Sequence, residues 1–139
     1  MPRATVLLDQ ATEAAAAFRQ LDQVQTDAIV HAVHLRALDA RVELARMAAD
    51  ETGLGVWQDK VVKNFIATQL VHDDIHHQRT VGVISQSRCD GIVEVARPVG
   101  PVLGFVPVTN PSATTIFKIL IALKTRNPII ISPPQAARR

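Results

Sequence analysis

Residues 97–134 read RPVGPVLGFVPVTNPSATTIFKILIALKTRNPIIISPP, and this stretch decides the fold. Val102–Val108 is a short apolar run with β-branched residues, which is typical of a strand buried on both faces. Ser112–Lys124 has a helical pattern of apolar residues, and Ile129–Ile131 is a second apolar strand. The residues on the apolar helical face are Ile116, Ile119, Leu120 and Leu123. The pattern predicts two parallel strands joined by a right-handed crossover helix, a βαβ unit.

The carboxyl ends of the two strands are the candidate ligand site, because open parallel sheets bind ligands there. The residues at these ends are Pro107, Val108, Thr109, Asn110, Ser132 and Pro133. The first loop leads into a helix N-terminus, where free N–H groups and the helix dipole favour an anion. Thr109 and Asn110 are also good N-cap residues, so they could contact a ligand or only cap the helix. No GxGxxG or P-loop motif decides between these interpretations.

Composition indicates one globular domain with a real core. The chain has 139 residues, 47% of them hydrophobic, and a formal net charge of +2. Scattered basic residues, one Trp and no Tyr argue against a nucleic-acid partner. The single cysteine, Cys89, excludes a disulfide framework and suits a reducing compartment. The absence of a signal-peptide pattern or a long apolar stretch predicts no membrane association and a cytoplasmic location.

The residue pattern predicts helices in the first half of the chain and a hairpin in the middle. The expected helices are Thr5–Leu21, Asp27–His34, Leu35–Glu51 and Val56–Asp73. We expect Thr26 to cap the second helix and Gly53 to end the third. The expected strands are Val81–Ile84 and Gly91–Ala96, with one exposed side and unpaired edges that carry an aggregation risk. These patterns divide the chain into a helical segment, 1–79, a hairpin, 80–97, and the start of the βαβ unit, 98–139.

Histidines gather at His72, His76 and His77, next to two aspartates. The i, i+4 spacing of His72 and His76 can present two imidazoles to one metal ion. The HExxH motif is absent, and histidines near a helix C-terminus complement its dipole. We therefore interpret the group as a solvated helix end and predict no metal site.

The other reactive side chains do not form a catalytic arrangement. Cys89 lies in a polar link between Arg88 and Asp90, whose charges oppose each other, so the positive field that a thiolate needs is missing. We interpret it as an incidental loop cysteine. Glu51 and Asp59 flank a turn and a helix start, and we interpret both as surface residues.

Two stretches of the chain resemble a known family. They are ETGLGVWQDKVVKN (Glu51–Asn64) and ARPVGPVLGFVPVTNPSATTIFKILIALKTRNPIIISPPQAARR (Ala96–Arg139). They resemble the CoA-acylating aldehyde dehydrogenases, above all the aldehyde dehydrogenase half of the bifunctional aldehyde–alcohol dehydrogenases. The signature P-x-G-x-x-x-G-x-V-P-x-T-N-P, followed by FK, LKTRN and SP, carries the resemblance. It implies an α/β fold: N-terminal helices, a β-hairpin and the first, incomplete βαβ unit of a Rossmann-like cofactor domain.

The resemblance also implies a reaction, in which an aldehyde, CoA and NAD⁺ interconvert with acyl-CoA and NADH through a cysteine thiolate. It implies that residues 107–110 line the NAD cleft and that Thr109 or Asn110 approaches the thiohemiacetal oxyanion. Ser132 and Pro133 fall where wider aldehyde dehydrogenases have a lysine that contacts the adenosine ribose. Ser132 departs from that pattern, which weakens any expectation of ribose recognition here.

The family's catalytic cysteine lies downstream of the segment that ends this chain, and Cys89 does not match it. We therefore expect an N-terminal portion that is inactive alone and belongs to an enzyme that is a homo-oligomer at full length. The alternative is a non-catalytic helical interaction module, or a truncated paralogue that binds a full-length partner. The genomic sequence immediately downstream would discriminate between them.

Overall fold

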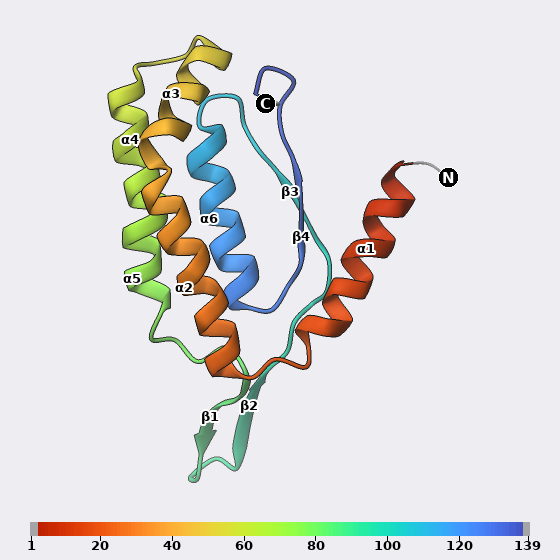
Figure 1. Cartoon of the computed structure of the whole chain (residues 1–139). Helices are drawn as coiled ribbons and strands as arrows, with labels where there is room; N and C mark the ends of the chain where they lie inside the picture. The colour runs from red at the N-terminus through yellow and green to blue at the C-terminus, as the bar shows by residue number, and fades with distance from the viewer. Residues whose placement is uncertain (1–2, 138–139) are drawn as a thin grey trace.

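The computed structural model describes residues 3–137, which form a layer of helices, a central helix, a small parallel sheet and a projecting hairpin (Figure 1). The elements in chain order are α1 (Arg3–Phe18), α2 (Gln23–Asp39), α3 (Arg41–Thr52), α4 (Trp57–Phe65), the π-helical segment η1 (Ile66–Leu70), α5 (Val71–Ile75), β1 (Gly82–Ser87), β2 (Ile92–Ala96), β3 (Val102–Phe105), α6 (Pro111–Lys124) and β4 (Ile129–Ser132). The predicted α/β class is confirmed.

The predicted βαβ unit is present. Strands β3 and β4 are parallel, with Val102 opposite Ile129 and Phe105 opposite Ser132. Helix α6 connects them and lies between the sheet and the layer of α2, α3, α4 and α5, whereas α1 stands on the other side of the sheet (Figure 1). The helix begins at Pro111, whose fixed φ suits the first helical turn.

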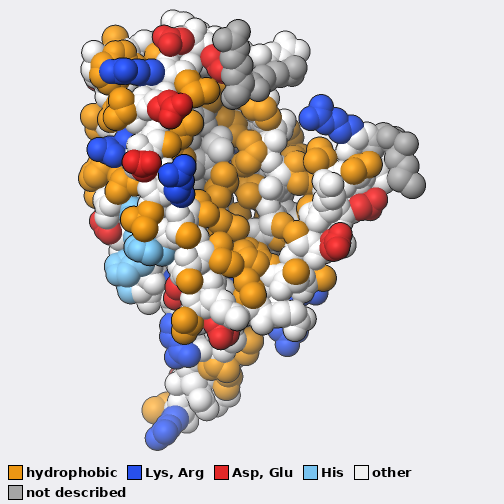
Figure 2. All heavy atoms as spheres, viewed as in Figure 1, with side chains coloured by type: hydrophobic (Ala, Val, Ile, Leu, Met, Phe, Trp, Pro, Cys, Tyr) orange, Lys and Arg blue, Asp and Glu red, His pale blue; other side chains and the backbone are white. Residues whose placement is uncertain are grey.

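One expectation about the first strand is wrong. Strand β3 ends at Phe105 rather than Val108, and it is not buried on both faces. Leu103 and Phe105 are 55% and 68% exposed, while Gly104 is buried against Ile129 and Ile131. Within the described chain, α1 covers only part of the face opposite α6. Figure 2 shows hydrophobic side chains gathered between α1 and the helical layer.

The start of α2 also differs from the prediction. Asp22 is the N-cap: its carboxylate accepts a hydrogen bond from the backbone N–H of Gln25, and the Gln25 side chain accepts one from the Asp22 N–H. Thr26 is buried inside the helix and its hydroxyl donates to the Asp22 carbonyl. The capping box therefore starts the helix earlier than Thr26 would, and α2 continues past His34 to Asp39.

The expected helix Leu35–Glu51 is wrong at its start, because Leu35 lies within α2 and α3 begins at Arg41. The other predicted helix features are largely confirmed. Gly53 ends α3 in the left-handed conformation, with φ of 63°. The expected helix Val56–Asp73 is one continuous rod made of α4, η1 and α5. The hydroxyl of buried Thr68 donates to the carbonyl of Asn64 where the rod widens into the π-helical turn.

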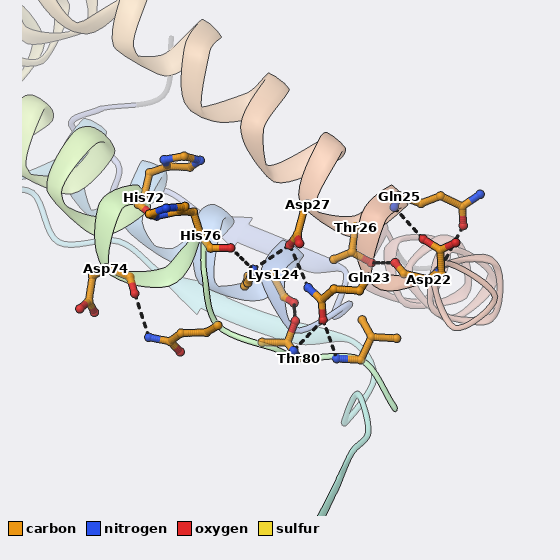
Figure 3. Close-up of polar contacts among 12 residues, drawn as sticks. Asp22, Gln23, Gln25, Thr26, Asp27, His72, Asp74, His76, Thr80 and Lys124 are labelled. Carbon is orange, nitrogen blue, oxygen red and sulfur yellow. Dashed lines mark hydrogen bonds and ion pairs between the residues drawn. The ribbon is translucent and has the colours of Figure 1, made fainter. Parts of the chain in front are cut away.

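A small apolar core joins α2, α5 and α6. Its buried members are Val30, Ile75, Ile116 and Leu120. Beside it, the ammonium group of buried Lys124 lies 2.7 Å from the Asp27 carboxylate and 3.0 Å from the His76 carbonyl (Figure 3). This ion pair ties the end of α6 to both α2 and α5.

The hairpin of β1 and β2 is antiparallel and projects away from the other elements (Figure 1). The expected pairing is confirmed, but both faces are exposed in this chain rather than one. Strand β1 extends through the polar residues to Ser87, because backbone pairing with β2 continues there. Among residues 3–137, no helix is long and apolar enough to span a bilayer.

Candidate functional site

The carboxyl ends of β3 and β4 lie side by side, as the predicted site requires. The backbone N–H of Val106 donates to the carbonyl of Ser132 across a distance of 3.1 Å, one residue beyond the last β3 pair. Ser132 is half-buried and Pro133 is exposed. The loop Pro107–Asn110 therefore leaves the sheet at the same end as Ser132 and Pro133.

The loop Pro107–Asn110 passes from the sheet to the first turn of α6. Pro107 and Thr109 are exposed, whereas Val108 and Asn110 are half-buried. Asn110 occupies the N-cap position, but its side chain makes no capping hydrogen bond within the described chain. Instead, Asn110 Oδ1 accepts a hydrogen bond from Lys63 Nζ at 3.1 Å. The interpretation that Asn110 only caps the helix does not hold.

Two lysines of α4 hold this loop from the helical side. Lys60 is buried, and its Nζ donates to the carbonyl oxygen of Thr109 at 3.0 Å. Burial lowers the pKa of Lys60, and the neighbouring charge of Lys63 lowers it further. The loop thus faces two ammonium groups at the N-terminal end of α6, where the helix dipole is also positive. This environment favours negative charge.

Asn64 connects the same helix to two other elements. It is fully buried, and its Nδ2 donates to the carbonyl of Arg41 at 2.9 Å. Its Oδ1 accepts a hydrogen bond from the hydroxyl of Ser112 at 2.8 Å. Both ends of the amide are satisfied, so the start of α3, the middle of α4 and the first turn of α6 are held together.

A cavity of about 210 Å³ opens beside the strand ends, between α3 and α6. The residues that line it include Val106, Pro111, Ser112, Pro133, Met47 and Glu51. The structure contradicts the prediction that Glu51 is a surface residue, because its Oε1 is buried and has no hydrogen-bond partner within residues 3–137. Pockets that enclose a whole small ligand are about 300–1,000 Å³, so this cavity is smaller than such a pocket.

The sequence interpretation missed the residues that hold the loop. Lys60, Lys63 and Asn64 follow i, i+3, i+4 spacing, which places them on one face of α4. The stretch Glu51–Asn64 contains them, but its local pattern does not show which distant segment that face meets. The signal that could have found them is a pair of lysines on one helical face beside an asparagine.

The histidines and Cys89 lie outside this site. His72, His76 and His77 gather with His31 and His34 of α2, which the sequence interpretation did not include. Within the described residues, no group of three or more His, Cys, Asp or Glu side chains is placed to hold a metal ion. Cys89 is exposed in the turn between β1 and β2, in a different sheet from the strand ends.

Comparisons with known proteins agree with this fold. Residues 3–138 match the aldehyde dehydrogenase family. The chain is 42% identical over 132 residues to the bifunctional aldehyde-alcohol dehydrogenase AdhE of Escherichia coli K12, which covers 95% of this chain and 15% of that protein. It is 41% identical over 126 residues to the sulfoacetaldehyde dehydrogenase (acylating) of Cupriavidus necator, covering 89% of this chain and 26% of that protein.

A solved structure shows the same arrangement. The acetylating aldehyde dehydrogenase of Geobacillus thermoglucosidasius superposes with a TM-score of 0.94 at 39% identity, covering 96% of this chain and 29% of that one. The chain thus spans less than a third of the relatives it matches. The parallel β3–α6–β4 unit, its P-x-G-x-x-x-G-x-V-P-x-T-N-P signature and these similarities show that the chain belongs to the aldehyde dehydrogenase family, with its likeness to the CoA-acylating members.

Proposed function

We propose that this chain is the N-terminal part of an NAD-dependent acylating aldehyde dehydrogenase. The reaction of the whole enzyme is aldehyde + CoA + NAD⁺ → acyl-CoA + NADH + H⁺, in which an aldehyde and CoA are the partners. The observation that supports this proposal is the loop Pro107–Asn110, fixed by Lys60 and Lys63 at the carboxyl end of a parallel β-pair. Open parallel sheets bind dinucleotides in this position.

The residues at the strand ends fit one wall of an NAD site. Pro107, Val108, Thr109 and Asn110 would line the side next to α6, and Ser132 and Pro133 would line the side next to β4. Bound NAD would supply the hydride acceptor of the reaction. Ser132 carries no charge toward a ribose, and the cavity of about 210 Å³ holds only part of a dinucleotide. We therefore expect weak binding by this chain alone.

In this proposal Asn110 would donate a hydrogen bond to the oxyanion. Its Oδ1 accepts the hydrogen bond from Lys63 Nζ, so the amide Nδ2 remains to donate toward a negatively charged oxygen. A fixed donor of this kind stabilises the charge that develops on a carbonyl oxygen, and removing one costs about 10²–10³ in turnover. Thr109 shapes the same turn through its carbonyl oxygen, which is held by Lys60.

The nucleophile of the reaction is proposed to lie outside these residues. Cys89 sits in the hairpin turn, exposed and away from the strand ends. The test is to assay the purified chain with acetaldehyde, CoA and NAD⁺ and to follow NADH absorbance. We expect no CoA-dependent NADH, and the same result for Cys89→Ala. NADH production that Cys89→Ala abolishes would overturn this proposal.

The whole enzyme is proposed to be a cytoplasmic homo-oligomer whose subunits meet through the hairpin. Both faces of β1 and β2 expose apolar side chains, including Val83, Ile92 and Val95. Unpaired strand edges of this kind pair readily with other chains. Light scattering of the purified chain should therefore detect self-association. A stable monomer at high concentration would argue against a hairpin interface.

A further inference from the structure

All five histidines of the chain lie in one cluster outside the site described above. His31 and His34 come from α2, His72 from α5, and His76 and His77 from the residues that follow α5. Neighbouring ring centroids are 4.0 to 5.9 Å apart. Figure 2 shows the histidine side chains together on one side of the helical layer. The sequence separates the two groups by 38 residues, from His34 to His72, so the fold alone brings them together.

The centre of the cluster is a stacked pair, His34 and His72. Their ring centroids are 4.0 Å apart and their planes differ by 16°. His34 is only 4% exposed, and the side chain of His72 is 13% exposed. The Nδ1 of His34 is buried without a hydrogen-bond partner among residues 3–137. Two neutral rings can stack in this way, but two imidazolium ions at this distance repel each other.

The carboxylate beside the stack offsets added protons only in part. Asp73 of α5 is the nearest carboxylate, 4.0 Å from His72 Nδ1, and it is half in solvent. Lys124 of α6 adds positive charge at the carbonyl of His76, and its own counterion is Asp27 of α2. His31 and His76 lie next to the stack on either side. The π-helical segment η1 contributes no titratable side chain.

We infer that the His34–His72 stack is a pH-sensitive contact that holds α2 against the η1–α5 part of the rod when both rings are neutral and loosens when either ring is protonated. The inference is independent of the proposed dehydrogenase function. The contact opens as the pH falls below about 6.5, the ordinary pKa of histidine. The segment α4–η1–α5 is continuous, so the loosened part adjoins the helix that carries Lys60 and Lys63.

The direction of the pH effect follows from both rings. Burial lowers the pKa of His34 and of His72, and the neighbouring histidines lower it further, while Asp73 opposes these effects. The unfolded chain then binds more protons than the folded chain at mildly acidic pH. Folding stability is complete above the ordinary histidine pKa of about 6.5 and falls as the pH drops toward the lowered values.

An NMR titration of the purified chain tests the contact directly. The five imidazoles are assigned in ¹⁵N-labelled protein and followed from about pH 8 to pH 5. We expect His34 and His72 to take up protons below about pH 6.5, and the amides of residues 30–38 and 66–75 to shift at the same midpoint. Protonation of both rings at or above pH 6.5, or without amide shifts on both helices, would overturn the inference.

A stability comparison provides the second test. Urea midpoints are measured near pH 7.5 and near pH 5.5 for the unmodified chain, His72→Gln and His77→Gln. His77 is exposed and meets only the edge of His76, so it is the matched control. We expect acidification to lower the midpoint of the unmodified chain and of His77→Gln by equal amounts, and that of His72→Gln by less. Equal acid losses in all three proteins would overturn the inference, and His34→Gln repeats the test from α2.

Discussion

The ammonium nitrogen of Lys60 lies 3.0 Å from the carbonyl oxygen of Thr109, although 49 residues separate them in the chain. Lys63, one turn later, donates a hydrogen bond to the side-chain oxygen Oδ1 of Asn110. Helix α4, in the first half of the chain, thus holds the loop Pro107–Asn110, which lies in the second half. The candidate cofactor loop is therefore a property of the whole fold rather than of the βαβ unit alone.

Replacing Lys60 should loosen the loop more than replacing Lys63 does. Lys60→Ala removes a charged hydrogen bond and a buried aliphatic stem, and we expect a loss of about 1–3 kcal/mol in the free energy of unfolding. Lys63→Ala removes an exposed contact and should cost less. Urea denaturation gives the stability, and amide hydrogen exchange at residues 106–110 gives the loop opening. Equal exchange rates in the two variants would contradict the role of Lys60.

Asn64 should be among the most sensitive positions in the chain. Asn64→Ala leaves the Arg41 carbonyl and the Ser112 hydroxyl without their partner, and we expect a loss of about 2–4 kcal/mol. Ser112→Ala removes only one of the two hydrogen bonds, so a loss of about 1 kcal/mol is expected. Thermal or urea unfolding of the two single variants and the double variant measures their coupling. Additive losses would contradict a stabilising hydrogen bond between Asn64 and Ser112.

The Lys124–Asp27 ion pair should respond asymmetrically to mutation. The Lys124 side chain is 3% exposed, whereas that of Asp27 is 40% exposed and can regain water. Asp27→Ala leaves the buried ammonium group without its counterion and should lower the free energy of unfolding by about 3–5 kcal/mol. Lys124→Met replaces the ammonium with an apolar group of similar length and should cost about 1–3 kcal/mol. Urea denaturation of both variants measures the two losses in the free energy of unfolding. A larger loss for Lys124→Met than for Asp27→Ala would contradict the expectation that the buried ammonium group depends more strongly on its partner.

Local signals in the sequence predicted much of the fold. A strand that begins at Val102, the helical face with Ile116 and Leu120, and the helix end at Gly53 each depend on neighbouring residues, and all three are confirmed. The error in the predicted start of α2 has a local cause as well. Asp22 and Gln25 form a complete capping box, which outcompetes the single hydroxyl of Thr26.

Long-range contacts were beyond prediction from local patterns. The exposure of Leu103 and Phe105 depends on which elements cover the second face of the sheet. The loop contacts of Lys60 and Lys63 and the pairing of His34 with His72 each join residues far apart in the chain. The burial of the Glu51 oxygen depends on the cavity between α3 and α6. Spacing places such residues on a helical face but does not identify the segment that this face meets. The sequence could therefore locate the candidate loop but not the residues that hold it.

The measurement that tests the central claim most directly is an NMR titration of the ¹⁵N-labelled chain with NAD⁺. The claim is that the carboxyl ends of β3 and β4 form one wall of the cofactor site. It predicts weak, saturable shifts at Val108, Thr109, Asn110 and Ser132, which Asn110→Ala reduces and Cys89→Ala leaves unchanged. Shifts confined to the hairpin or to α1, or no shifts at millimolar NAD⁺, would contradict it.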